Sequence, residues 1–149
     1  MADTESAQQL VVFSLGEEEY ALPITQVQEI IRYAEPRAVA SQDAWIKGVI
    51  SLRGKIIPVC DLAARLGLAG ERAANAKIVI VETAGGTAGV IVDDVEEVLT
   101  LEQEQLDAVP AAGSDVIEGI AKIGDRLVVL LDPDSIFAGT RLDTAAAAA

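Results

Sequence analysis

The chain has 149 residues, 51% of them hydrophobic, which is enough for one domain or for two small domains packed closely together. Its formal net charge of −13 argues against nucleic-acid binding, because affinity for a phosphate backbone comes from Lys and Arg. The sequence has neither an apolar stretch of about 20 residues nor the basic start of a signal peptide, so we expect a cytoplasmic protein without direct membrane insertion.

Two β-hairpins are predicted, one in each half of the chain. Each consists of two runs rich in Val, Ile and Leu that are separated by a glycine-containing turn, a pattern typical of antiparallel strands. The predicted strands are 10–15 and 20–24 in the first half, and 77–82 and 87–92 in the second. The two hairpins also match residue by residue, with Val27, Glu29 and Ile30 after the first corresponding to Val95, Glu97 and Val98 after the second.

A second duplicated element follows each hairpin. Residues 48–62 align without a gap with residues 119–133. In this alignment Gly48 corresponds to Gly119 and Asp61 to Asp132. The apolar runs 56–60 and 127–131 within them predict strands that are buried on both faces. Pro58 lacks a backbone N–H, so it requires an edge, a bulge, or a position where that N–H faces away from the neighbouring strand.

Each of these long strands ends at an aspartate. Asp61 and Asp132 are predicted N-caps of the short helices 62–66 and 133–137, because a carboxylate there accepts a bond from an unpaired helix N–H. Pro133 suits the first helical position. A catalytic carboxylate is the alternative reading, although the sequence offers no base or metal ligand beside either residue.

Together these elements predict an all-β fold of two small barrels packed around an apolar seam, with few short helices. The barrels are expected at about 10–70 and 77–137, within one domain over 10–137, and exchange of strands between them is left open. Residues 1–9 are expected to form a flexible leader and residues 140–149 a flexible tail.

Most catalytic chemistry lacks its residues in this chain. The sequence contains no histidine, and Cys60 is its single cysteine, so we expect a core thiol, no internal disulfide and no cofactor. Asp93, Asp94, Glu96 and Glu97 form the densest acidic cluster. Because adjacent strand residues point to opposite faces, we do not expect them to converge on a metal ion. A carboxylate-dependent enzyme remains the remote alternative.

Arg53 is the most informative charged residue, because it lies between apolar residues and precedes Gly54. It could be a solvent-facing turn residue. The alternative is an ion pair with an acid, for which Glu29 at the end of the first hairpin is the favoured partner. An exposed pair contributes little stability, so its main effect would be to shape a surface.

Residues 48–62 resemble the signature of the CheW family, bacterial chemotaxis coupling proteins in which an N-L-R-G motif precedes an apolar strand that ends in Asp-Leu. The resemblance continues in residues 20–24, 27–30, 89–98 and 119–132, and so covers about 10–137. Ser51 stands where the family usually has Asn, a departure that affects a local turn bond.

This resemblance implies two five-stranded SH3-like barrels and an adaptor function without catalysis. CheW-like proteins couple the cytoplasmic tips of methyl-accepting chemoreceptors to the regulatory domain of the histidine kinase CheA in two-component signalling. The chain is then expected to be monomeric outside the receptor array and recruited to it. A coupling protein of a pilus-motility or other chemosensory pathway is the alternative.

The resemblance also implies particular residue roles. The receptor tip, a helical hairpin, is expected to dock in a groove between the barrels, and the matching positions are Val27, Glu29 and Arg53. Kinase contacts are expected at the barrel ends, with no residues assigned. The structural signature positions are Gly48, Gly54, Asp61, Gly89, Asp93, Gly119 and Asp132.

Overall fold

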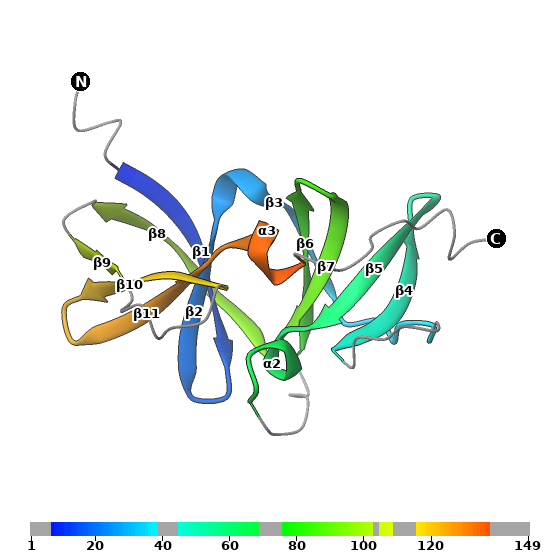
Figure 1. The fold of residues 1–149 in the computed structure, drawn as a ribbon, viewed down its shortest axis with the longest axis horizontal. Helices are drawn as coiled ribbons and strands as arrows, with labels where there is room; N and C mark the ends of the chain where they lie inside the picture. The colour runs from blue at the N-terminus through cyan, green and yellow to red at the C-terminus, as the bar shows by residue number, and fades with distance from the viewer. Residues whose placement is uncertain (1–6, 39–44, 69–75, 103–104, 109–115, 138–149) are drawn as a thin grey trace.

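The computed structural model describes residues 7–38, 45–68, 76–102, 105–108 and 116–137 (Figure 1). The strands in these ranges are β1 (Ala7–Leu15), β2 (Glu18–Pro23), β3 (Val27–Arg32), β4 (Ile46–Leu52), β5 (Lys55–Asp61), β6 (Lys77–Thr83), β7 (Gly86–Val92), β8 (Asp94–Glu102), β9 (Leu106–Ala108), β10 (Ile117–Ile123) and β11 (Arg126–Leu131). The helical elements are the 3-10 turn η1 (Ile24–Gln26) and the helices α2 (Leu62–Arg65) and α3 (Pro133–Ile136). None of these helices is long and apolar enough to cross a membrane.

The strands form two mixed sheets, which confirms the all-β fold class. A six-stranded sheet has the order β8-β1-β2-β11-β10-β9, and a five-stranded sheet has the order β3-β6-β7-β5-β4. Among the described residues, the first sheet therefore has six strands where the resemblance implies five. The additional strand is the short strand β9. The expected tail at 140–149 lies outside the described residues, as do residues 1–6 of the leader, whereas β1 already begins at Ala7.

Each sheet combines strands from both halves of the sequence. After the hairpin β1–β2, strand β3 leaves to pair with β6 in the other sheet. After the hairpin β6–β7, strand β8 leaves to pair with β1. The exchange is therefore reciprocal, as in a swapped dimer whose two subunits have been joined into one chain.

The two long hairpins confirm the duplication read from the sequence. Gly48 pairs with Val59 in β4–β5, and Gly119 pairs with Leu130 in β10–β11. Each hairpin has a register shift immediately before its glycine. Both halves thus build the same hairpin with the same irregularity.

Pro58 occupies a position that needs no backbone donor. It lies opposite Val49, whose own N–H and C=O bond to Arg37 at 2.9 and 2.8 Å, away from β5. Residues opposite each other in a non-hydrogen-bonded pair both direct these groups outward. The parallel ladder to β7 begins only at Val59. The missing N–H therefore faces away from β4, as one of the predicted alternatives requires.

The two strand-end aspartates are N-caps, as predicted. The Asp61 carboxylate accepts a bond from the Ala64 N–H at 3.3 Å at the start of α2. The Asp132 carboxylate accepts bonds from the Asp134 N–H at 3.1 Å and from the Ser135 hydroxyl at 2.9 Å at the start of α3. These bonds satisfy helix donors that otherwise lack partners.

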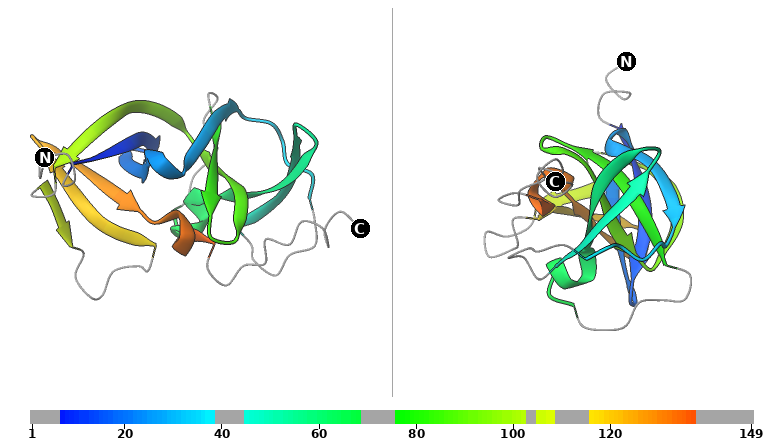
Figure 2. Two further views of the ribbon diagram at one scale, coloured as in Figure 1. Left: turned by 90° about the horizontal axis from the view of Figure 1, so that it is seen from above. Right: turned by 90° about the vertical axis from the view of Figure 1, so that its right-hand side faces the viewer.

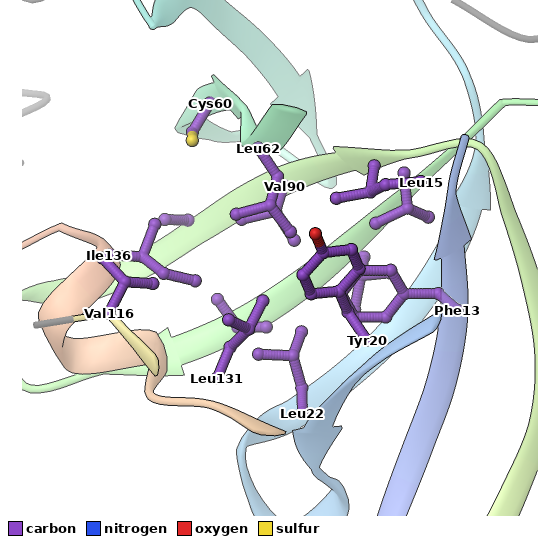
Figure 3. Packing of buried hydrophobic residues seen from close by; sticks show 14 of the residues in the cluster. Phe13, Leu15, Tyr20, Leu22, Cys60, Leu62, Val90, Val116, Leu131 and Ile136 are labelled. Carbon is purple, nitrogen blue, oxygen red and sulfur yellow. The ribbon is translucent and has the colours of Figure 1, made fainter. Parts of the chain in front are cut away.

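An apolar seam joins the two sheets (Figure 3). Its buried members come from both sheets and from the segments around α2 and α3: Phe13, Leu15, Tyr20, Leu22, Cys60, Leu62, Val79, Val81, Ala88, Val90, Val92, Val116, Leu131, Ile136 and Phe137. Two smaller apolar clusters lie within the individual sheets, one around Leu10, Val12 and Leu130 and the other around Ile57, Ile78 and Ile80. The predicted apolar seam is therefore the largest core cluster of the described residues.

Candidate functional site

Arg53 lies in the two-residue turn between β4 and β5, in an uncommon backbone conformation. Its φ of 51° and the Gly54 φ of 80° both fall in the left-handed region. Two-residue hairpin turns of type I′ require positive φ at both positions, which usually selects Asn-Gly. An Arg at the first of them is unusual, and an unusual backbone at a surface turn directs attention to its side chain.

The predicted ion pair between Arg53 and Glu29 is present. The Arg53 guanidinium donates to the Glu29 carboxylate through Nη1, and this bond raises the pKa of Arg53. Glu29 lies on β3, so the pair links the edge strand of the five-stranded sheet to the turn between its strands β4 and β5. The Arg53 side chain remains 73% exposed, which leaves its other N–H groups open to solvent.

A bulge shapes the start of β3. Val27 and Glu29 pair with consecutive residues of β6, which leaves Gln28 as the extra residue. Val27 packs against the seam, whereas Ile30 is 40% exposed. The Gln28 amide donates to the Glu82 carboxylate on β6, which also accepts a bond from the Thr87 hydroxyl at 2.9 Å. The Gln28 bond therefore holds the bulged strand against β6, its neighbour in the sheet.

Three of the signature glycines allow backbones and side chains to approach closely. A Cβ at Gly48, where φ is +148°, would lie 2.0 Å from the Arg37 carbonyl oxygen. At Gly119 it would lie 2.8 Å from the Asp107 carbonyl oxygen, and at Gly89 it would lie 2.8 Å from Ile78 Cγ2. These positions therefore require the absence of a side chain.

The acidic cluster is divided among different partners. Asp93 accepts a bond from the Gly16 N–H at 2.6 Å, which ties the crossing into β8 to the turn of the first hairpin. Asp94 pairs with Lys77 at 3.3 Å, and Glu97 pairs with Arg126 at 2.7 Å. The described part of the chain contains no group of three or more ligand-type residues that could hold a metal ion.

Sequence reasoning missed the second ion-pair cluster. Arg126 at the start of β11 bonds Glu97 on β8 and also binds Glu19 on β2 through two nitrogens, at 3.0 and 2.8 Å. These bonds lower the pKa of Glu19. The duplication could have indicated this cluster. Glu97 is the counterpart of Glu29, so the repeat predicts a basic partner for Glu97 as well.

Strands β3 and β8 carry Val27, Glu29, Ile30 and Val98, whereas Arg53 comes from the turn between β4 and β5. In the left view of Figure 2 both strands run along one side, and α3 lies toward the other. Val98 on β8 is 53% exposed and is the counterpart of Ile30. We use the name β3–β8 face for the surface around these two strands, comprising Val27, Glu29, Ile30, Arg53 and Val98. Glu29 and Ile30 are successive residues of β3 and point to opposite sides of that strand.

Cys60 belongs to the seam and not to this face. Its side chain is fully buried, and burial raises the pKa of its thiol. Because the thiolate is the reactive form, we expect no reaction with a thiol reagent such as DTNB in the folded protein and one equivalent of thiol after unfolding in guanidinium. Rapid labelling of the native protein would contradict the buried position.

These features define a class of protein. The two sheets exchange strands and share a common apolar seam, and β3 carries both Glu29, which pairs with the exposed Arg53, and the exposed side chain of Ile30. An arrangement of this kind suits a protein-interaction domain.

The chain belongs to the CheW-like domain family, whose model matches residues 9–141. The chemotaxis protein CheW of Klebsiella aerogenes is 31% identical over 147 residues, covering 95% of this chain and 89% of that protein. CheW of Bacillus subtilis is 32% identical over 140 residues, covering 91% of this chain and 90% of that protein. The crystal structure of the scaffolding protein TtCheW from Thermoanaerobacter tengcongensis superposes with a TM-score of 0.83 at 35% identity, covering 89% of this chain and 94% of that one.

A more distant similarity extends to a protein with another name. PilI of Pseudomonas aeruginosa is 27% identical over 113 residues, covering 72% of this chain and 64% of that protein. The chemotaxis relatives cover more of the chain at higher identity. The chain is therefore a chemotaxis coupling adaptor of the CheW-like family.

Proposed function

We propose that this adaptor joins the cytoplasmic tips of methyl-accepting chemoreceptors to the regulatory domain of a CheA-type histidine kinase, without catalysing a reaction. On this proposal the protein is cytoplasmic and becomes concentrated at membrane-associated receptor arrays. Family membership and the match of residues 48–62 to the family signature support the two partners. The ion pair of Arg53 with Glu29 on the β3–β8 face is the observation that carries the proposal.

The proposed receptor site is the β3–β8 face. Ile30 and Val98 supply exposed apolar area, as expected for contacts with the apolar stripe of a helix. Val27 packs against the seam, so it anchors the start of β3 to the core. Glu29 fixes the direction of Arg53, which still has free N–H donors for a polar group of the partner.

A coupling function in pilus motility is the second candidate. The similarity to PilI favours it, although it covers less of the chain than the chemotaxis relatives do. Binding to receptor tips of a chemotaxis pathway and of a pilus pathway, compared at equal concentrations, separates the two candidates.

Replacing Arg53 by Asn is expected to weaken binding to a receptor-tip fragment by about tenfold, as the loss of a well-placed interfacial Arg does. Asn tolerates the left-handed conformation and forms the preferred Asn-Gly turn with Gly54, so the hairpin should be retained. The measurement is isothermal titration calorimetry with a soluble receptor fragment carrying the tip, together with CheA autophosphorylation in reconstituted arrays.

Lys55→Gln provides the matched control, because it removes a neighbouring exposed positive charge outside the ion pair. It should bind the tip like the parent protein. Unchanged affinity and unchanged kinase control in Arg53→Asn, with a folded protein, would contradict the proposed receptor role of Arg53.

A further inference from the structure

The bulge at the start of β3 has a counterpart in β8. Strand β3 has its extra residue at Gln28, directly before Glu29. Strand β8 shifts register between its pairings with Val12 and Phe13, which leaves Glu96 as the extra residue directly before Glu97. A bulge changes the direction of the side chains that follow it. In both strands the first side chain after the bulge is an acid that bonds an arginine.

The two arginines hold these acids from different positions. Arg53 comes from the turn between β4 and β5, whereas the equivalent turn between β10 and β11 has Gly124 in that place. The role of Arg53 is taken by Arg126, the counterpart of Lys55, two residues after Gly124. Arg126 bonds Glu97 at 2.7 Å while Glu19 engages the same guanidinium through two hydrogen bonds.

The Arg126 bond gives strand β8 a second attachment at an edge of its sheet. In the sheet order it pairs with β1, and it is the last strand on that side. The Arg126 bond ties it to β11, beyond the two intervening strands β1 and β2. Arg126 itself is anchored on β2 through Glu19. The guanidinium therefore connects the edge strand with the middle of the sheet.

The residue directly after each of the two acids is apolar and exposed. Ile30 follows Glu29 and is 40% exposed, and Val98 follows Glu97 and is 53% exposed. Successive strand residues point to opposite faces, so an acid that bonds an arginine on one face leaves the next side chain on the other face. The two arginines act on the same feature in the two halves of the molecule.

We propose that Arg126 is a positioning residue of the receptor site: through Glu97 it holds β8 so that Val98 is presented on the β3–β8 face. This inference rests on the proposed receptor function of that face. Arg126 does not itself belong to the face. Its bond to Glu97 carries the effect on docking, and its bonds to Glu19 serve as the anchor.

The test compares Arg126→Gln, Glu97→Gln and the double variant with the parent protein, using the soluble receptor-tip fragment as the probe. We expect each single variant to bind the tip roughly fivefold more weakly, within the range known for residues that act at a distance. The double variant should be no weaker than either single one, because both changes break the same link. Lys122→Gln, which breaks the ion pair with Asp107 on β9, is the matched control and should bind normally.

Hydrogen exchange supplies a measurement that does not depend on the receptor. In Arg126→Gln the amides of β8 around Val98 should exchange faster, while those of β3 keep the parent rate. A purely structural role would lower the melting temperature and leave the tip affinity at low temperature unchanged, which would overturn the inference. Additive losses in the double variant would also overturn it.

The failure of the proposed function would be recognised separately. If the parent protein does not bind the tip, the receptor role is lost for all variants alike, and altered exchange in β8 would then report only the structural link. If the parent binds and Arg53→Asn does not, but Arg126→Gln binds like the parent, the receptor role stands and the positioning role of Arg126 is refuted.

Discussion

Replacement of Gly48 by Ala is expected to lower the stability of the protein by at least about 3 kcal/mol, a large share of the 5–15 kcal/mol typical of a domain. Two costs combine at this position. The backbone has φ +148°, which L-residues rarely adopt, and the new Cβ would lie 2.0 Å from the Arg37 carbonyl oxygen. The obstacle is backbone, so it cannot move aside like a flexible side chain. The segment around Arg37 also pairs with Val49, so displacing it breaks two hydrogen bonds.

Urea unfolding followed by far-UV circular dichroism measures this effect. Gly16→Ala is the appropriate control, because Gly16 also has a positive φ, of 62°, but its new Cβ would meet nothing within 4 Å. The control should cost only about 1–2 kcal/mol, the penalty for the left-handed conformation alone. Equal losses in the two variants would show that the contact with Arg37 has no energetic consequence.

The duplication explains why so much of the fold could be predicted from the sequence. The match of residues 48–62 with 119–133 predicted two equivalent long strands, and the hairpins that contain these strands have the same register shift before Gly48 and Gly119. The strand-end aspartates were predictable because capping is a local interaction between a carboxylate and the next helix turn. Local patterns of this kind leave a clear signal in a single sequence.

Which strand pairs with which neighbour could not be predicted in the same way. The stretches that become β3 and β8 resemble each other, so their sequences do not distinguish pairing within one half from exchange between the halves. The choice of partner depends on the short crossings at η1 and at Asp93, where Asp93 bonds Gly16 in the turn of the first hairpin. Such a contact joins residues far apart in the sequence, and no local pattern predicts it.

The candidate site shows the same division. The ion pair of Glu29 with Arg53 was predicted because the signature placed Arg53 in a turn and the hairpin end offered an acid. The cluster of Arg126 with Glu19 and Glu97 was missed because Arg126 departs from the repeat, with Gly124 in the place equivalent to Arg53. Because the two halves have diverged at these positions, the repeat did not indicate that Arg126 would bond Glu97, the counterpart of Glu29.

Replacement of Phe13 by Ala is expected to destabilise both sheets together, by about 3–5 kcal/mol. Phe13 is fully buried in the seam and stacks on Tyr20 with ring centroids 6.2 Å apart. Although it lies on β1 of the six-stranded sheet, the seam includes residues of both sheets. Because β3 and β8 cross between the sheets, neither sheet can lose its packing without disturbing a strand of the other.

Unfolding should therefore remain a single transition in this variant. Trp45 is the sole tryptophan and packs against the seam beside β4 of the five-stranded sheet, so its fluorescence reports on the sheet that does not contain Phe13. Its denaturation curve should coincide with that of far-UV circular dichroism, and both should shift to lower urea concentration. Leu127→Ala, at a position that is 60% exposed, should leave both curves nearly unchanged. If the fluorescence curve kept the midpoint of the parent protein while the circular dichroism curve shifted, the five-stranded sheet would be stable by itself. The exchanged strands would then not couple the unfolding of the two sheets.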